Sequence, residues 1–167
     1  MASELAQINV GRTLYPLDDP RMDGFTGRLD AVNALAEAAP GFVWRLQSDS
    51  GNATDIKVSD DPQFIVNLSV WRDAEALFDF VYRTRHREVM VQRRQWFEPP
   101  KGVFQALWWV PAGHRPTPQE GLAAIARLEA EGPTPAAFSF KQRFAPPEAQ
   151  GGAAEGLDPA PWCVGWS

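Results

Sequence analysis

The sequence predicts an α+β fold built on one antiparallel sheet. Three observations lead to this class. Four segments alternate in character or are rich in β-branched and aromatic residues, two longer segments repeat apolar residues at helical spacing, and together they run strand, helix, strand, strand, helix, strand. A third helical segment and an extension follow the fourth strand.

The first part of the chain predicts a strand, a helix and a second strand. Residues 4–11 alternate as a strand, and residues 20–38 repeat apolar side chains at helical spacing until a Pro-Gly pair ends the helix. Residues 42–47 alternate again. The polar segment 48–62 is long for a compact domain, so it is either a functional loop, such as a lid or a subunit contact, or a solvated hairpin connection.

The clearest strand covers residues 64–71 and leads directly into a helix. One side of this strand is wholly apolar and the other is mixed. The two sides are Phe64, Val66, Leu68 and Val70 against Ile65, Asn67, Ser69 and Trp71. Asp73 is a suitable N-cap for the helix that begins at residue 74, and a pair of prolines ends this helical region. One stripe of the helix carries Phe78, Tyr82, His86 and Met90 at a spacing of four.

The last part of the chain predicts a fourth strand and an additional helix. Residues 103–111 form the strand, and residues 118–130 form the helix, with Thr117 as its N-cap. Residues 136–144 alternate in the manner of an added edge strand.

The organisation of the chain predicts one domain and a tail. Residues 1–144 are long and apolar enough to form a single core, whereas residues 145–167 are rich in Pro, Gly and Ala and are expected to be mobile. Seven tryptophans and ten phenylalanines are many for this size, so an interface or a pocket is expected to shelter some of them.

Charge and cysteine content exclude several classes of function. With 16 basic and 21 acidic residues the chain is mildly acidic, which disfavours general binding to nucleic acids or anionic membranes. Cys163 is the single cysteine, so no disulfide can form within the chain and a reducing compartment is expected. No segment has the character of a signal peptide or a membrane span, and we expect a soluble, cytoplasmic protein.

The order of the elements predicts a ferredoxin-like sheet with both crossover helices on one face. The mixed side of the strands is expected to be the face without helices. Its members include Asn9, Arg45, Asn67, Ser69 and Trp71. Such a face needs a cover, so we expect a symmetric homodimer in which two sheets face each other.

Several segments also carry a family resemblance. The strand ending in NLSVW and the helix running on to His86 resemble the dimeric α/β-barrel superfamily, which includes antibiotic-biosynthesis and haem-degrading monooxygenases. The segments LAQINVGR, NLSVW, HREVMVQRRQWF, LWWVPAGHRPT and GPTPAAFSF are similar to the bacterial family called domain of unknown function 3291. This resemblance covers about residues 4–144; it implies the dimeric barrel fold and brings no established activity.

A small-molecule site is expected in a cavity beside the sheet, between sheet and helices or between two facing sheets. Four polar residues are placed at this cavity, and four aromatic residues form its wall, because small-molecule sites are mostly apolar with a few convergent polar groups. They are Asn9, Arg45, Asn67 and His86, with Trp44, Trp71, Tyr82 and Trp109.

His86 is the sharpest catalytic candidate, with Asn9 and Asn67 beside it. A histidine can serve as a general base near neutral pH or as an axial ligand of haem iron. The alternative is that His86 packs in the core among Phe78, Tyr82 and Met90. His114, in a turn after the fourth strand, is read as a structural loop histidine, and no zinc or mononuclear iron site is expected.

Haem is the one cofactor that the resemblance implies. The haem-degrading relatives use an asparagine on the first strand, a tryptophan on the second helix and a histidine at its end; Asn9 and His86 match two of these. Arg83 and Arg87 are expected to receive haem propionates or a substrate carboxylate. The arginine cluster 83–94 is otherwise a solvated helix face paired with glutamates.

These observations leave three hypotheses for function. The first is a small enzyme, resembling cofactor-independent monooxygenases, that acts on an aromatic or polyketide-like substrate. The second is a haem-binding protein or haem-dependent enzyme with His86 as axial ligand. The third is a non-catalytic ligand-binding or dimerisation module. The fold is common to all three and does not separate them.

Overall fold

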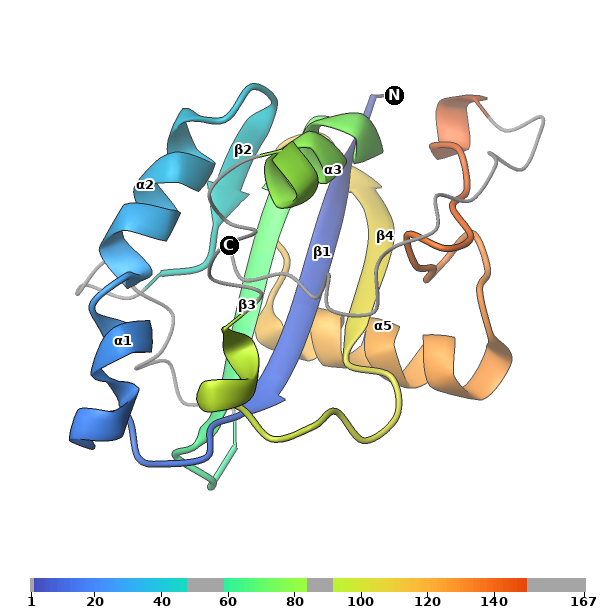
Figure 1. Ribbon diagram of the computed structural model, residues 1–167. Coiled ribbons are helices and arrows are strands. Elements are labelled where there is room, and N and C mark those ends of the chain that lie inside the picture. The colour runs from blue at the N-terminus through green and yellow to red at the C-terminus, as the bar shows by residue number, and fades with distance from the viewer. Residues whose placement is uncertain (1, 48–58, 84–91, 150–167) are drawn as a thin grey trace.

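The computed structural model describes residues 2–47, 59–83 and 92–149. They form one four-stranded antiparallel sheet in the order β2-β3-β1-β4 (Figure 1). The strands are β1 (Ser3–Arg12), β2 (Phe42–Arg45), β3 (Phe64–Trp71) and β4 (Gln105–Pro111). The longer helices are α2 (Leu29–Ala38), α3 (Ala74–Arg83) and α5 (Pro118–Glu131). The predicted ferredoxin-like α+β class, with its extra helix after the fourth strand, is confirmed.

Strand β1 lies at the centre of the sheet and fixes its register. Leu5 pairs with Trp71 of β3 and with Trp109 of β4, and Asn9 pairs with Asn67 and Gln105. Because residues directly opposite one another point to the same side of a sheet, this register decides which side chains share a face. The two faces that result are covered by different helices.

One face contacts α2 and α3. Its core holds Leu5, Trp71 and Leu107 of the sheet, packed against Leu77 and Phe80 of α3. The other face contacts α5, which runs behind the sheet in Figure 1 while α3 crosses in front. We call them the α3 face and the α5 face. The α5 face holds Ala6, Ile8, Val66, Leu68, Val70, Ala106 and Val110, packed on Ala124, Ile125 and Leu128.

The expectation that the mixed side of the strands is the face without helices is wrong. Asn9, Asn67, Ser69 and Trp71 lie on the α3 face, beneath helices, and the wholly apolar side is covered by α5. The physical reason is that the wholly apolar side also needs a cover, and α5 supplies it. The homodimer stays a prediction, but its argument from an uncovered mixed face no longer holds.

Gly121 allows α5 to approach the sheet closely. A Cβ atom at this position would collide with the Ile8 side chain and would lie 3.1 Å from the Ile8 Cβ. Thr117 caps the helix by accepting a hydrogen bond from the Glu120 N–H at 3.2 Å, as the sequence predicts. In α3 the predicted cap is also confirmed, since Asp73 accepts from the Ala76 N–H at 2.8 Å.

The stretch predicted as one helix over residues 20–38 is divided into three pieces. These are η1 (Pro20–Met22), α1 (Asp23–Thr26) and α2. Gly24 and Gly27 weaken helix formation in this stretch. Trp96 packs so closely on Gly24 that an added Cβ would lie 3.0 Å from its ring. The single long helix is therefore a wrong prediction: α1 ends at Gly27, and α2 begins anew at Leu29.

The segment over residues 136–144, expected as an added edge strand, contacts the sheet through an isolated β-bridge and is not assigned as a strand. Phe138 exchanges two backbone hydrogen bonds of 2.8 Å with Leu107 on the edge of β4, and turns lie on either side. After it, η3 (Pro147–Ala149) ends the described part of the chain. The tail from residue 150 lies outside the described residues, and the domain boundary at residue 144 stays a prediction. None of the helices described is long and apolar enough to cross a membrane.

Candidate functional site

Three amide side chains form a row across the middle of the α3 face. Asn67 of β3, Asn9 of β1 and Gln105 of β4 are direct cross-strand neighbours, and we call them the polar row. Asn9 is buried, with 4% of its surface exposed, whereas Asn67 and Gln105 are half-buried. The row therefore places hydrogen-bonding groups inside the protein, with solvent reaching its two ends.

A second set of polar groups supports the row from one side. The Gln7 side-chain Nε2 donates to Asn67 Oδ1 at 2.6 Å and to Ser69 Oγ at 2.9 Å. Trp71 Nε1 also donates to Ser69 Oγ, at 2.9 Å. These bonds hold Asn67 in one orientation and satisfy its oxygen.

Asn9 lacks such support. Its Oδ1 is buried and has no hydrogen-bond partner among the described residues. Buried polar side chains in native proteins are nearly always hydrogen-bonded, and an exception demands an explanation. A bound molecule that donates a hydrogen bond to this oxygen would supply one.

Apolar clusters flank the polar row on both sides. In the cluster that contains α3 residues, Trp71 stacks on Phe80 with ring centroids 5.1 Å apart. In a second cluster, beyond the other end of the same face, Phe25 packs edge-on against Phe97 with ring centroids 5.1 Å apart, next to Ile65 and Trp96. A few amide groups between aromatic clusters match the usual composition of a small-molecule site.

Arg93 brings a positive charge to the second cluster. It opens η2 (Arg93–Gln95), and its guanidinium carbon lies 5.8 Å from the Phe97 ring centroid and 5.7 Å from that of Phe104. Burial lowers the pKa of Arg93 from its ordinary value. One guanidinium nitrogen lies 3.9 Å from where a Cβ on Gly11 would be, and Gly11 shares the α3 face with Asn9.

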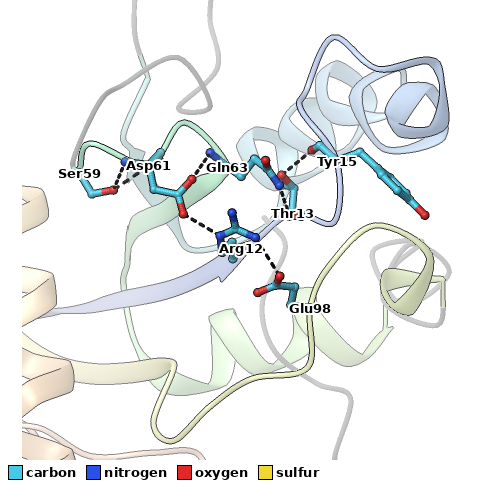
Figure 2. A network of polar contacts seen from close by, with 7 residues as sticks. All are labelled: Arg12, Thr13, Tyr15, Ser59, Asp61, Gln63 and Glu98. Atoms are coloured by element: carbon cyan, nitrogen blue, oxygen red, sulfur yellow. Dashed lines mark hydrogen bonds and ion pairs between the residues drawn. The ribbon is translucent and has the colours of Figure 1, made fainter.

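A polar network joins the end of β1 to Asp61 and Gln63 and to Glu98 (Figure 2). Arg12, at the end of β1, lies between Asp61 at 2.7 Å and Glu98 at 2.8 Å. The Glu98 N–H donates to the Arg12 carbonyl at 2.9 Å, and Thr13 forms a bridge with Phe97. The end of β1 is thus tied to the segment that follows η2.

The structure brings several predicted site residues onto one face. Asn9, Asn67, Arg45 and Trp71 share the α3 face. Arg45 Nε is ion-paired with Glu37 of α2 at 2.8 Å, so its charge is already compensated. Trp71 is fully buried in the core.

Two further aromatic residues of the predicted pocket pack against the cluster that holds Trp71. Tyr82 stacks on Phe78 of the same helix, with ring centroids 4.1 Å apart. Trp109 lies opposite Leu5, at the same level of the sheet as Trp71, and donates from Nε1 to the Phe144 carbonyl at 2.9 Å.

Other predicted residues are not joined to this group. Trp44 packs with the cluster of the α5 face, because neighbouring residues of a strand point to opposite sides. His86 and Arg87 lie outside the described residues. Arg83 ends α3, and its side chain is not described. His114 is exposed and contacts Glu120 at 2.8 Å, in keeping with its expected role in a loop.

Sequence reasoning did not single out Gln7, Ser69, Gln105 or Arg93 as site residues. Gln7 and Ser69 had a signal, since they alternate with Asn9 and Asn67 on the mixed sides of two strands. Gln105 had none before the register of β4 was known. Arg93 could not be separated from the other arginines of its cluster by spacing alone.

A separate hollow of about 400 Å³ lies at the other end of the sheet. Trp109, Val110 and Pro111 line it from β4, and Pro147 and Glu148 line it from η3. The Glu148 carboxylate accepts hydrogen bonds from the Ser3 N–H and hydroxyl at 2.8 and 2.7 Å, and the hydroxyl is the larger cause of its lowered pKa. Among the predicted site residues that the structure describes, Trp109 alone lines this hollow.

The described residues form a ferredoxin-like α+β fold with the polar row on one face of its sheet. The chain belongs to the family described as Domain of unknown function (DUF3291), which matches residues 4–154. The predicted resemblance to this family is confirmed. No curated protein matches the chain.

Three of the solved structures that are similar to this chain share 13–17% sequence identity with it. PA3566 from Pseudomonas aeruginosa is 15% identical, with a TM-score of 0.44, and the match covers 70% of this chain and 98% of that one. NE2512 of Nitrosomonas europaea, a protein of unknown function, is 13% identical at a TM-score of 0.43, covering 70% and 95%. A candidate antibiotic biosynthesis monooxygenase from Chloroflexus aurantiacus J-10-fl is 17% identical at 0.39, covering 67% and 97%. Similarities at these TM-scores carry no argument about function.

Proposed function

We propose that the protein binds a small, electron-rich aromatic molecule at the polar row and oxidises it with molecular oxygen. The observation that carries the proposal is the buried Asn9 Oδ1, which lacks a partner among the described residues in the middle of the α3 face. An amide oxygen in this position favours a ligand that donates a hydrogen bond. Aromatic clusters on both sides favour a planar, apolar body for that ligand.

The proposed reaction converts an acidic CH2 group of the substrate to a carbonyl. A base removes one proton, the resulting carbanion supplies electrons to O2, and a carbon–oxygen bond forms. The proton held by the base, the second C–H proton and one oxygen atom then leave as water. The sum is CH2 + O2 → C=O + H2O, so the substrate itself is the reductant.

The protein would contribute a base and orienting groups to this reaction. We propose His86 as the base, from its place in the sequence three residues after the end of α3. Asn9 and Asn67 would orient the substrate through its polar groups. Arg45 is given no role at the reacting atoms because it is paired with Glu37.

Haem fits the described residues poorly. The described histidine, His114, is exposed and held by Glu120, away from the polar row. In the described part of the chain no histidine lies on the α3 face, so the haem alternative depends on His86, as the proposed base does.

An oxygen electrode with anthrone as substrate tests the proposal. We expect one O2 consumed for each anthraquinone formed, with the rate falling by about 10²- to 10⁴-fold in His86→Ala. The control His114→Ala, which removes the exposed histidine, should retain the full rate. Asn9→Leu should raise KM because it removes the accepting oxygen.

The two alternative functions predict different results in haem titration and in oxygen consumption. A Soret band on haem titration that is lost in His86→Ala, without oxygen consumption, would replace the oxygenase by a haem-binding protein. Neither oxygen consumption nor haem binding would leave a non-catalytic module. Either result would contradict the proposed function.

A further inference from the structure

We propose that the hollow between the start of β1, the end of β4 and η3 binds a small organic ammonium ion with an apolar body. The site lies apart from the polar row and does not depend on the function proposed above. Ser3, in its wall, precedes Asn9 by six residues on β1, a distance of about 20 Å along an extended strand. Three features lead to this class of ligand: the size and lining of the hollow, the single charge in its wall, and the use of its hydrogen-bond donors.

The hollow has the size and the lining of a site for a small molecule with an apolar body. Its volume of about 400 Å³ falls within the range of about 300–1,000 Å³ that is usual for such sites. Most of its wall is apolar, and the larger apolar residues are Trp109, Pro111 and Pro147. An indole ring offers an apolar surface and also attracts a cation to its face.

Glu148 brings a negative charge to this wall, and it is the one charged residue among the described residues that line the hollow. Its two carboxylate oxygens accept from the Ser3 N–H at 2.8 Å and from the Ser3 hydroxyl at 2.7 Å. Both donors are neutral, so they orient the carboxylate without cancelling its charge, and each oxygen keeps a lone pair for a second donor. The Ser3 hydroxyl is the main cause of the lowered pKa of Glu148 and the N-terminal ammonium of the chain is the smallest, so the carboxylate is ionised near neutral pH.

The side-chain donors in the described wall are already used within the protein. Trp109 Nε1 donates to the Phe144 carbonyl at 2.9 Å, and the Ser3 hydroxyl donates to Glu148. The two prolines have no N–H group. An anionic ligand would therefore meet a carboxylate and no side-chain donor, whereas an ammonium group brings N–H donors of its own to the oxygens of Glu148 and Ser3.

The groups that would contact the ligand are held in place by the sheet. Ser3 pairs with Pro111 in the ladder between β1 and β4, so its two bonds to Glu148 fix η3 against the strand. The Trp109 ring is held by its bond to Phe144 and by Phe138, with ring centroids 6.5 Å apart. Groups that are ordered before binding lose little conformational entropy when a ligand arrives.

Calorimetric titration at low ionic strength with three probes of equal shape tests the proposal. The probes are 2-phenylethylammonium, 2-phenylethanol and 3-phenylpropionate, which present a cation, a neutral group and an anion on the same apolar body. We expect wild type to bind the ammonium about 10-fold more tightly than the alcohol, the usual effect of a hydrogen bond to a charged group, and to bind the anion most weakly. Added NaCl should reduce the preference for the cation, because salt screens charges at the protein surface.

Variants of two exposed glutamates identify the receiving group. Glu148→Gln should lower the affinity for 2-phenylethylammonium to that for 2-phenylethanol and leave the alcohol unchanged. Glu148→Lys should reverse the preference, so that 3-phenylpropionate becomes the tightest of the three probes. The matched control Glu131→Gln removes an exposed carboxylate at the end of α5, outside the hollow, and should bind all three probes as wild type does.

Equal binding of the ammonium and the alcohol to wild type would overturn the proposal, and so would the absence of ammonium binding. Equal losses in Glu148→Gln and Glu131→Gln would overturn it too, because they would assign the binding to the net charge of −5 on the whole chain. Full ammonium binding by Glu148→Gln with a loss in Asn9→Leu would move the amine to the polar row and contradict the proposal. Oxygen consumption enters none of these measurements, so the proposed oxygenase stands or fails independently.

Discussion

The two faces of the sheet bury different chemistry, and two adjacent residues of β1 display the contrast. Ile8 is fully buried on the α5 face and meets Gly121 of α5. Asn9 is almost as buried on the α3 face, yet its side-chain oxygen lacks a partner in the described chain. Ile8 fills space in the core, whereas the Asn9 side-chain oxygen lacks a hydrogen bond among the described residues.

This difference separates the part of the molecule that stabilises the fold from the part available for function. Apolar burial contributes about 25 cal/mol per Å², whereas an unpaired buried polar group costs stability. A sheet that needed only a core would place apolar residues on both faces. The retention of amides on the α3 face is the reason to seek a ligand there.

The largest expected effect comes from the α5 face. Ile8→Ala should lower the free energy of unfolding by about 2–5 kcal/mol, because it opens a cavity under α5. Urea denaturation followed by circular dichroism measures the change. Leu14→Ala, which shortens an exposed leucine, is the control and should change stability by less than about 0.5 kcal/mol. Similar values for the two variants would show that α5 does not pack tightly on Ile8.

The close approach of α5 gives the next effect. Gly121→Val should destabilise by about 1–3 kcal/mol through overpacking against Ile8. The control Ala123→Val puts the same side chain on an exposed position of the helix and should cost only a few tenths of a kcal/mol, about its helix propensity. The cost of Gly121→Val should shrink in an Ile8→Ala background, where space is available; an undiminished cost would assign it to another contact.

On the α3 face the sign of the effect should change. Asn9→Leu should leave stability unchanged or raise it by about 1 kcal/mol, because an apolar group replaces a buried oxygen without a partner. The matched variant Asn67→Leu should destabilise by about 1–3 kcal/mol, since it removes the acceptor of Gln7 and leaves a buried donor unpaired. If both asparagines behaved alike, the contrast between them would be refuted.

The smallest expected effect is on the stability of the fold in acid, through the carboxylates of Asp19 and Asp61. The Gln63 N–H, followed by Arg12, lowers the pKa of Asp61, and Arg21 lowers the pKa of Asp19 to about 2. Carboxylates with depressed pKa values stabilise the folded state above their ordinary pKa, and this contribution is lost as the pH falls from about 4 toward 2. Urea midpoints across this window should fall less for Asp19→Asn and Asp61→Asn than for wild type. An identical acid dependence in the variants would show that these carboxylates do not report on folding.

The strands were predictable because alternation has a strong physical cause. Residues of β3 alternate cleanly, and its bounds agree with the predicted strand over residues 64–71. The face covered by each helix was not predictable, because the period of a strand separates its two sides without saying which helix lies on either. That information resides in the contact between Gly121 and Ile8, which are far apart in the sequence.

The site was partly predictable for a similar reason. The alternation of polar residues identified Asn9 and Asn67, but the register that adds Gln105 is a tertiary property. In β2 an irregularity between Phe42 and Trp44 breaks the strict alternation, so Phe42 packs with the α3 face and Trp44 with the α5 face. A bulge of this kind has no clear signature in a short strand.

The central position of β1 has a consequence for how the chain is made. Its Leu5 pairs with Trp71 on one side and with Trp109 on the other, so the ribosome completes this strand well before either neighbour exists. Pairing between such distant segments folds slowly, because loops must close before the contacts form. We therefore expect the nascent chain to expose an unpaired, largely apolar strand until β4 has emerged, which is the condition under which chaperones bind.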